Sequence, residues 1–159
     1  LCHFPCAGDN KLFVIVPPKP KIETKEDLDR LLAKLAYQGK SGVNYLDPRY
    51  LLDEIEVPRG PYLIRDVEDG RDNLNLSPDK AREKFKDEGS SPLTLWEVYS
   101  LLVSFSFAIF GHHNIDASGS RSESGRTPDV YLWLERPRLN HKWSDDSDPH
   151  WGSASSGRV

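Results

Sequence analysis

The sequence lacks the short motifs that mark the most common enzyme classes. Its 159 residues contain no Gly-x-x-x-x-Gly-Lys-Ser/Thr phosphate loop, no His-Glu-x-x-His zinc helix, no Gly-x-Ser-x-Gly nucleophile turn and no Gly-x-Gly-x-x-Gly dinucleotide motif. Each of these motifs places backbone donors, metal ligands or a nucleophile where its reaction needs them. Their absence argues against ordinary nucleotide hydrolysis, zinc proteolysis and α/β-hydrolase chemistry, and no residue is predicted to be catalytic on this basis.

The chain also lacks a strong excess of charge and a long uncharged apolar run. The formal net charge is −4, and both signs are spread along the sequence, so a basic face for duplex nucleic acid is not expected. The most apolar segment, residues 93–110, contains Glu97 and several serines. Its uncharged part is shorter than the ~20 residues that a membrane span needs. We expect a buried helix there and no membrane span.

Cysteine is scarce, and the metal-ligating residue types lack a ligand pattern. Cys2, His3 and Cys6 form a Cys-His-x-x-Cys cluster that is one ligand short of a structural zinc site. Whether Cys2 and Cys6 are free, disulfide-bonded or bound to a metal is left open. Neither a calcium-loop spacing nor a zinc spacing occurs among the later histidines and aspartates, so no metal and no cofactor are predicted. These residues are His112, His113, His141, His150, Asp145, Asp146 and Asp148.

The low cysteine content suits a reducing compartment. The first apolar run is followed by lysines instead of being preceded by them, so no secretory signal is predicted. We therefore expect a cytoplasmic protein. Whether a segment was removed upstream of Leu1 is left open.

Capping residues and apolar periodicity predict about three helices, over residues 24–39, 77–89 and 94–111. Short β-rich runs predict strands at residues 11–16, 62–67, 113–117, 130–134 and 140–144. Residues 145–159 have the composition of coil and turns. The strands are too few and too unevenly spaced for a doubly wound parallel sheet.

The predicted fold is therefore α+β: a small, mainly antiparallel sheet flanked by about three helices, with an irregular C-terminal tail packed on the domain. A chain of this length suits one domain, residues 1–159. Within it, residues 1–20 form an N-terminal strand with a Pro-rich connection, and residues 118–159 form an Arg/Trp-rich loop, strand and tail.

The most unusual composition lies in residues 118–159. Five arginines stand against one lysine there, together with three tryptophans and several Gly-Ser pairs. Arginine offers a planar set of donors to carboxylate or phosphate and stacks on aromatic rings, and tryptophan gives a large rigid contact area. These residues suit either a binding surface or the anchoring of an irregular tail. The candidate ligand- or partner-binding residues are Arg121, Arg126, Trp143, His150, Trp151 and Ser153.

Several motifs in residues 60–156 resemble an uncharacterised bacterial family, a domain of unknown function found in actinobacteria and some other phyla. The matching pieces run in the family's order: Pro61-Tyr62-Leu63-Ile64, Asp66-Val67-Glu68-Asp69-Gly70, Ser91-Pro92-Leu93-Thr94, Gly119-Ser120-Arg121 and Pro149-His150-Trp151-Gly152-Ser153-Ala154-Ser155. The family has no established activity, so the resemblance implies no catalytic residue. It implies a bacterial, intracellular protein.

Three functional hypotheses follow. The first is a non-enzymatic binding or protein-interaction module that holds a protein partner or a small anion against the tail. The second is a hydrolase in which His150 is the general base, Ser153 or Ser155 the nucleophile and Asp148 the orienting group. The third is a structural subunit of a larger assembly, which would use the apolar helix and the tail as interfaces.

Overall fold

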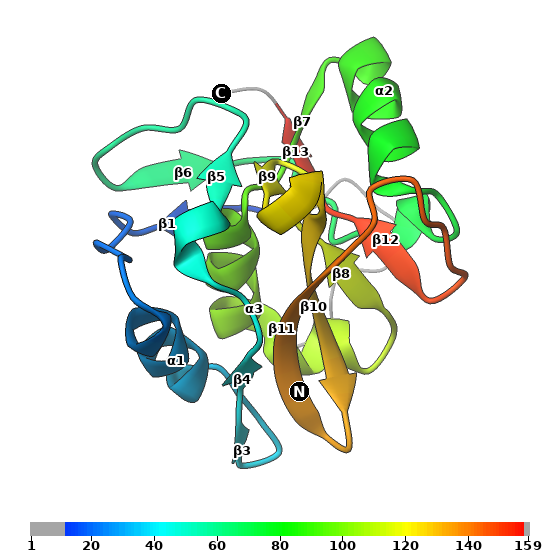
Figure 1. Cartoon of the computed structure of the whole chain (residues 1–159). Coiled ribbons are helices and arrows are strands. Elements are labelled where there is room, and N and C mark those ends of the chain that lie inside the picture. The colour runs from blue at the N-terminus through cyan, green and yellow to red at the C-terminus, as the bar shows by residue number, and fades with distance from the viewer. Residues whose placement is uncertain (1–11, 158–159) are drawn as a thin grey trace.

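A computed structural model describes residues 12–157 of the chain, in which helices and strands are interspersed (Figure 1). The described residues form three α-helices, three short 3-10 turns and thirteen strands. The α-helices are α1 (Lys25–Lys34), α2 (Pro78–Glu88) and α3 (Leu95–Phe110), and the 3-10 turns are η1 (Pro48–Tyr50), η2 (Arg71–Asn73) and η3 (Glu123–Gly125). The strands are β1 (Val14–Val16), β2 (Ala36–Tyr37), β3 (Lys40–Ser41), β4 (Val43–Asn44), β5 (Leu52–Asp53), β6 (Tyr62–Ile64), β7 (Ser90–Pro92), β8 (Asn114–Asp116), β9 (Ser120–Arg121), β10 (Thr127–Trp133), β11 (Arg136–Lys142), β12 (Trp151–Ser153) and β13 (Ser155–Gly157).

The three predicted helices are confirmed, with their caps. Thr24 and Thr94 each form a full capping box, in which the threonine hydroxyl accepts the N3 amide and the N3 acid accepts the cap amide. α1 ends at Lys34, earlier than predicted, and Leu35 is its C-terminal cap. Gly39 does not stop the helix because it lies, with φ +77°, in the tight turn between β2 and β3.

The α+β prediction is also confirmed, and the largest sheet has five strands in the order β12-β8-β10-β11-β4. Its centre is antiparallel, because β10 pairs antiparallel with both β8 and β11. The two edge strands pair parallel, β12 with β8 and β4 with β11. Four further two-stranded sheets are antiparallel and join β1 to β6, β7 to β13, β2 to β3 and β5 to β9.

The two faces of the five-stranded sheet differ in chemistry. Ile115, Val130 and Leu139 lie side by side on one face, are at most 2% exposed and join the core that contains the buried side of α3. Because neighbouring residues on a strand point to opposite faces, Asp116 and Asp129 lie on the other face. The sheet therefore buries an apolar layer against α3 and carries polar side chains behind it.

The C-terminal tail is more regular than the sequence predicted: residues 145–150 are turns and coil as expected, but the expectation of coil is wrong for residues 151–157. Residues 151–153 form β12 on the edge of the large sheet, and residues 155–157 form β13 beside β7. The amide of Ser155 donates to the carbonyl of Glu68, whose amide donates back to Ser155, both at 2.9 Å. A run of small residues shows no apolar alternation, so these strands depend on distant backbone partners.

The tail also contains the closest backbone approach among the described glycines. A Cβ atom built on Gly152 would lie 1.9 Å from the carbonyl oxygen of Gly70, and one built on Gly70 would lie 2.6 Å from the oxygen of Gly152. Only glycine fits at such a crossing. The tail motif and the motif that contains Gly70 are thus packed directly on each other.

Candidate functional site

Arg121 is bound into the interior of the protein. Its guanidinium donates to Thr127 Oγ1 at 2.7 Å and to Asp79 Oδ1 at 3.1 Å, and its Nε lies 3.3 Å from Glu54 Oε2. Its side chain is only 12% exposed. All of these partners belong to the chain itself, so Arg121 joins β9, β10 and α2.

Arg126 and Trp143 form a surface pair close to the predicted site. The Arg126 guanidinium lies 4.1 Å from the centre of the Trp143 ring, and its NH1 lies 3.0 Å from His141 Nε2. The other ring nitrogen of His141 contacts Ser122 Oγ at 2.7 Å. Partial burial and the neighbouring Arg126 charge lower the pKa of His141. Arg126 and Trp143, two of the predicted binding residues, thus contact each other, and Arg126 also contacts His141.

The other predicted tail residues are dispersed. His150 is exposed, whereas Ser153 is fully buried. Trp151 packs against Tyr131, with ring centres 5.3 Å apart, and carries the Lys142 ammonium 5.0 Å from its ring centre. The structure therefore brings Arg126 and Trp143 into contact, whereas Arg121 is held by Thr127, Asp79 and Glu54, and Ser153 is buried.

The residues of the predicted hydrolase site are not assembled for catalysis. Asp148 Oδ1 accepts the backbone amide of His150 at 2.7 Å, which is a local turn contact that leaves the imidazole ring unoriented. Ser153 Oγ is buried and makes no hydrogen bond within residues 12–157. A nucleophile and its base need direct contact, and this pair of side chains lies in opposite environments.

The polar face of the large sheet holds a buried group that we call the acidic row: Ser153, Asp116 and Asp129, on the adjacent strands β12, β8 and β10. The strand register places Ser153 beside Asp116 and Asp116 beside Asp129. All three residues are at most 3% exposed. Within the described part of the chain, Ser153 Oγ, Asp116 Oδ1 and Asp129 Oδ1 have no hydrogen-bond partner. Orphaned buried oxygens are rare in folded proteins and call for a functional or structural reason.

One cation reaches the acidic row. Lys142 Nζ lies 3.5 Å from Asp116 Oδ2, and the lysine side chain is 13% exposed. Burial raises the pKa of Asp116 to about 6, although Lys142 opposes this shift. Burial and the neighbouring Asp116 charge raise the pKa of Asp129 well above its usual value, again against the influence of Lys142. Lys142 therefore contacts Asp116, whereas burial and the Asp116 charge favour the protonated form of Asp129.

Residues 143–150 connect β11 to β12. Because β11 and β12 run in the same direction, residues 143–150 must return from the end of β11 to the start of β12. The carbonyl oxygens of Ser144 and Asp148 accept the amides of Asp79 and Asn75, each at 3.0 Å. The return segment is thus fixed to the region around the start of α2.

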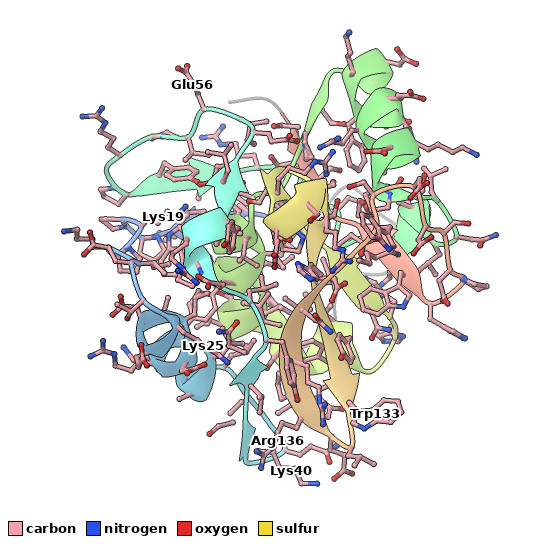
Figure 2. The ribbon with its side chains drawn as sticks, in the orientation of Figure 1. Lys19, Lys25, Lys40, Glu56, Trp133 and Arg136 are labelled. Atoms are coloured by element: carbon pink, nitrogen blue, oxygen red, sulfur yellow. The ribbon has the colours of Figure 1, made fainter. Side chains whose placement is uncertain are left out.

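The opposite end of the hairpin formed by β10 and β11 is exposed. Trp133 is 57% and Leu134 77% exposed, and the turn residues Leu134 and Glu135 have φ values of 52° and 60°. Figure 2 shows Trp133 and Arg136 at this tip, with Lys40 of β3 beside it. Lys40 Nζ lies 2.7 Å from Glu135 Oε2. We call Trp133, Leu134, Glu135 and Arg136 the hairpin end.

An apolar pocket lies between α1 and the core, with a cavity volume of about 30 Å³. The polar groups of its aromatic lining are already engaged: Trp96 Nε1 donates to the carbonyl of Pro17 at 2.8 Å and the Tyr99 hydroxyl to that of Leu31 at 3.0 Å. The pocket offers little beyond apolar contact.

Between residues 12 and 157, no cluster of three or more His, Cys, Asp or Glu side chains could hold a metal ion. His113 is buried and its Nε2 lies 2.7 Å from the backbone oxygen of Asp69, and burial lowers its pKa. Cys2 and Cys6 lie outside the described residues.

No helix in the described part is both long and apolar enough to cross a membrane.

A comparison with known protein families agrees with the family resemblance of the motifs in residues 60–156 and covers more of the chain. A family model described as "Family of unknown function (DUF5701)" matches residues 6–159. No curated protein and no solved structure matches the chain. The match covers nearly the whole sequence, including all of the strands of the large sheet and the hairpin end. The chain belongs to the family of unknown function DUF5701.

Proposed function

We propose that the protein is a non-enzymatic interaction module that binds a partner protein through the hairpin end. The observation that carries this proposal is the exposure of Trp133 and Leu134 at the tip of a two-strand projection. Tryptophan, tyrosine and arginine dominate the energetics of protein interfaces, and Leu134 beside Trp133 is 77% exposed. A cytoplasmic location, and one domain over the whole chain, are parts of the same proposal.

The backbone of the tip supports a role beyond folding. A two-residue hairpin turn with both φ angles positive favours Asn-Gly, because residues with larger side chains are strained there. Leu134 and Glu135 occupy these positions. A left-handed leucine costs about 1 kcal/mol relative to a favourable residue. Strain of this kind accumulates at binding sites, where the side chain is needed for contact.

The charges around the hairpin end indicate what kind of partner fits. Arg138 donates to the Tyr45 hydroxyl at 2.8 Å, a contact with a neutral group that leaves its charge uncompensated, and Arg136 adds a second positive charge at the tip. Lys40 is paired with Glu135. The matching surface is an apolar pocket with an acidic rim. The Glu135 carboxylate at the tip disfavours insertion into an anionic membrane.

The proposal is tested by photo-crosslinking in cells that naturally make the protein. A photoreactive aromatic residue replaces Leu134 in one variant and Leu52, which is 66% exposed on β5, in a matched control. We expect a discrete protein adduct from position 134 only, and the crosslinked partner peptide should lie beside Asp or Glu residues. The adduct should be lost when Arg136 and Arg138 are both changed to Glu.

Three outcomes contradict this assignment. Equal adducts from both positions indicate non-specific contact. An adduct that persists when Arg136 and Arg138 are changed to Glu shows that the partner does not use an acidic rim. Crosslinking to lipid, together with binding to anionic vesicles that salt abolishes, replaces the protein partner with a membrane surface.

A further inference from the structure

The contact between Lys142 and Asp116 brings an amine and a carboxyl group together in a nearly closed space. Lys142 Nζ lies 3.5 Å from Asp116 Oδ2, and the side chains are 13% and 0% exposed. Lys142 is the last residue of β11 and Asp116 the last of β8, so the lysine side chain reaches across β10. The ring of Trp151 lies below the ammonium group, 5.0 Å away. This distance joins Nζ to a carboxylate oxygen, and the carbon that an amide bond would use, Cγ, is bonded directly to that oxygen.

A third group, Asp129, faces the same carboxyl. The amide of Ala117 donates to the carbonyl of Pro128 at 2.9 Å, which makes residues 117 and 128 a hydrogen-bonded pair across the antiparallel strands. Asp116 and Asp129 are then the adjacent, non-hydrogen-bonded pair, in which the side chains approach most closely. Two buried like charges in such a position repel each other strongly.

The charge balance determines the state of the pair. Two ionised carboxylates and one ammonium group leave one net negative charge in a buried site, and one proton on a carboxyl removes it. Lys142 contacts Asp116, so the proton belongs on Asp129. Within the residues described here, neither Asp116 Oδ1 nor Asp129 Oδ1 receives a hydrogen bond that would stabilise a carboxylate. The site thus holds an amine, a poorly stabilised carboxylate and a neutral carboxylic acid.

We propose that Lys142 and Asp116 condense to form an isopeptide bond between Nζ and Cγ, with Asp129 as the acid–base group. The Lys142 ammonium first gives one proton to the Asp116 carboxylate, a transfer that a water-poor site favours because it removes both charges. The nitrogen lone pair then attacks Cγ of Asp116. Asp129 gives its proton to the departing hydroxyl, which leaves as water, and the resulting carboxylate takes a proton from the attacking nitrogen.

This condensation needs no outside reagent. One N–C bond forms, one C–O bond breaks, and one ammonium and one carboxylate become one amide and one water molecule. No group is oxidised or reduced, and Asp129 ends in the protonated state in which it began. The product joins β11 to β8 across β10 and anchors the start of the return segment, residues 143–150.

Mass spectrometry of the purified protein tests the bond. We expect an intact mass lower than the sequence mass by one water, and a branched tryptic peptide that joins the segments around Asp116 and Lys142, with no cleavage after Lys142. Lys40 and Glu135 form an exposed ion pair at 2.7 Å and serve as an internal control. They should remain unlinked, because water surrounds them and no third acid faces them in the described structure.

Three variants separate the bond from other losses of water, such as succinimide formation at Asp69-Gly70. Lys142→Arg keeps the charge and should restore the full sequence mass. Asp116→Asn should lose one ammonia instead of one water, because the amide nitrogen is then the leaving group. Asp129→Asn should slow or abolish the reaction in a folded protein.

Two results overturn the proposal. The first is an unchanged sequence mass of the wild-type protein after prolonged incubation of the folded protein at neutral pH. This result means that Lys142 and Asp116 form only an ion pair. The second is a water loss that persists in Lys142→Arg, which places the lesion elsewhere. If Asp129→Asn fails to fold, the branched peptide that joins position 116 to Lys142 in Asp116→Asn still decides between bond and ion pair, because a succinimide at position 116 loses ammonia without forming a branch.

Discussion

The crossing of Gly152 over Gly70 gives a sharp prediction about the tail. In Gly152→Ala, the new Cβ would lie 1.9 Å from the Gly70 carbonyl oxygen and 2.8 Å from its carbonyl carbon. Ordinary contact requires the two backbones to separate by more than about 1 Å. Both segments are fixed, since Ser155 and Glu68 exchange hydrogen bonds and Asn73 Nδ2 donates to the Ser153 carbonyl at 3.0 Å. Overpacking against a rigid backbone costs about 3 kcal/mol.

Urea denaturation followed by tryptophan fluorescence measures this cost, since Trp151 lies next to the substitution. Gly60→Ala is the matched control, because a Cβ at Gly60 meets nothing within 4 Å. We expect the control to be unchanged or more stable by about 0.5 kcal/mol, from the reduced entropy of the unfolded chain. A Gly152→Ala protein within about 0.5 kcal/mol of wild type, with an equal denaturant slope, would refute the tight crossing.

Three further predictions concern the hairpin end, a buried acid and the tail arginines. Replacing Leu134 by Asn and Glu135 by Gly should raise the free energy of unfolding by about 1 kcal/mol, because this pair suits the turn; no gain in chemical denaturation contradicts the inferred strain. Burial raises the pKa of Glu68 to about 7, so the folded state holds a proton that the unfolded state releases near its ordinary pKa of 4.5. This contribution to stability is complete below that ordinary pKa and is lost as the pH rises through 7. The slope of unfolding free energy between about pH 5 and pH 7 should become shallower in Glu68→Gln, and equal slopes argue against it. Arg121→Ala should cost about 2 kcal/mol in the same denaturation assay and Arg126→Ala less than about 1 kcal/mol, because the first loses three internal partners; the reverse order contradicts this difference.

The helices could be predicted from the sequence because their signals are local. Thr24 and Thr94 lie three residues from the acids that complete their caps, and both boxes are present in the structure. Neither needs a distant partner to form. The same locality explains why the α+β class was predicted correctly while the pairing of strands was not.

The hairpin of β10 and β11 was only partly predictable. Its turn residues, Leu134 and Glu135, are poor turn formers, and Pro137 argues against a strand. The predicted strand at residues 140–144 therefore began four residues later than β11 does, and ended beyond it. Long-range register overrides these local preferences, since all seven residues of β11 pair with β10.

The acidic row could not be found from the sequence. Asp116 and Asp129 are thirteen positions apart and belong to no motif, and only the register of β8 and β10 brings them together. Ser153 was predicted to bind a ligand or partner, or to be one of two possible nucleophiles, and it is fully buried. The β-forming residues next to each aspartate indicate that both lie on strands. They do not indicate which strands are neighbours in the sheet.

The late position of β12 and β13 in the chain has a consequence for synthesis on the ribosome. Residues 151–157 pair with Glu68, β7 and β8, all of which are made earlier. Until they emerge, β8 has an open edge and β7 lacks its partner strand. Open strand edges are prone to pairing with other chains. The nascent protein therefore completes its fold only after residue 157 is free of the exit tunnel, and any pause in translation before that point exposes an aggregation-prone intermediate.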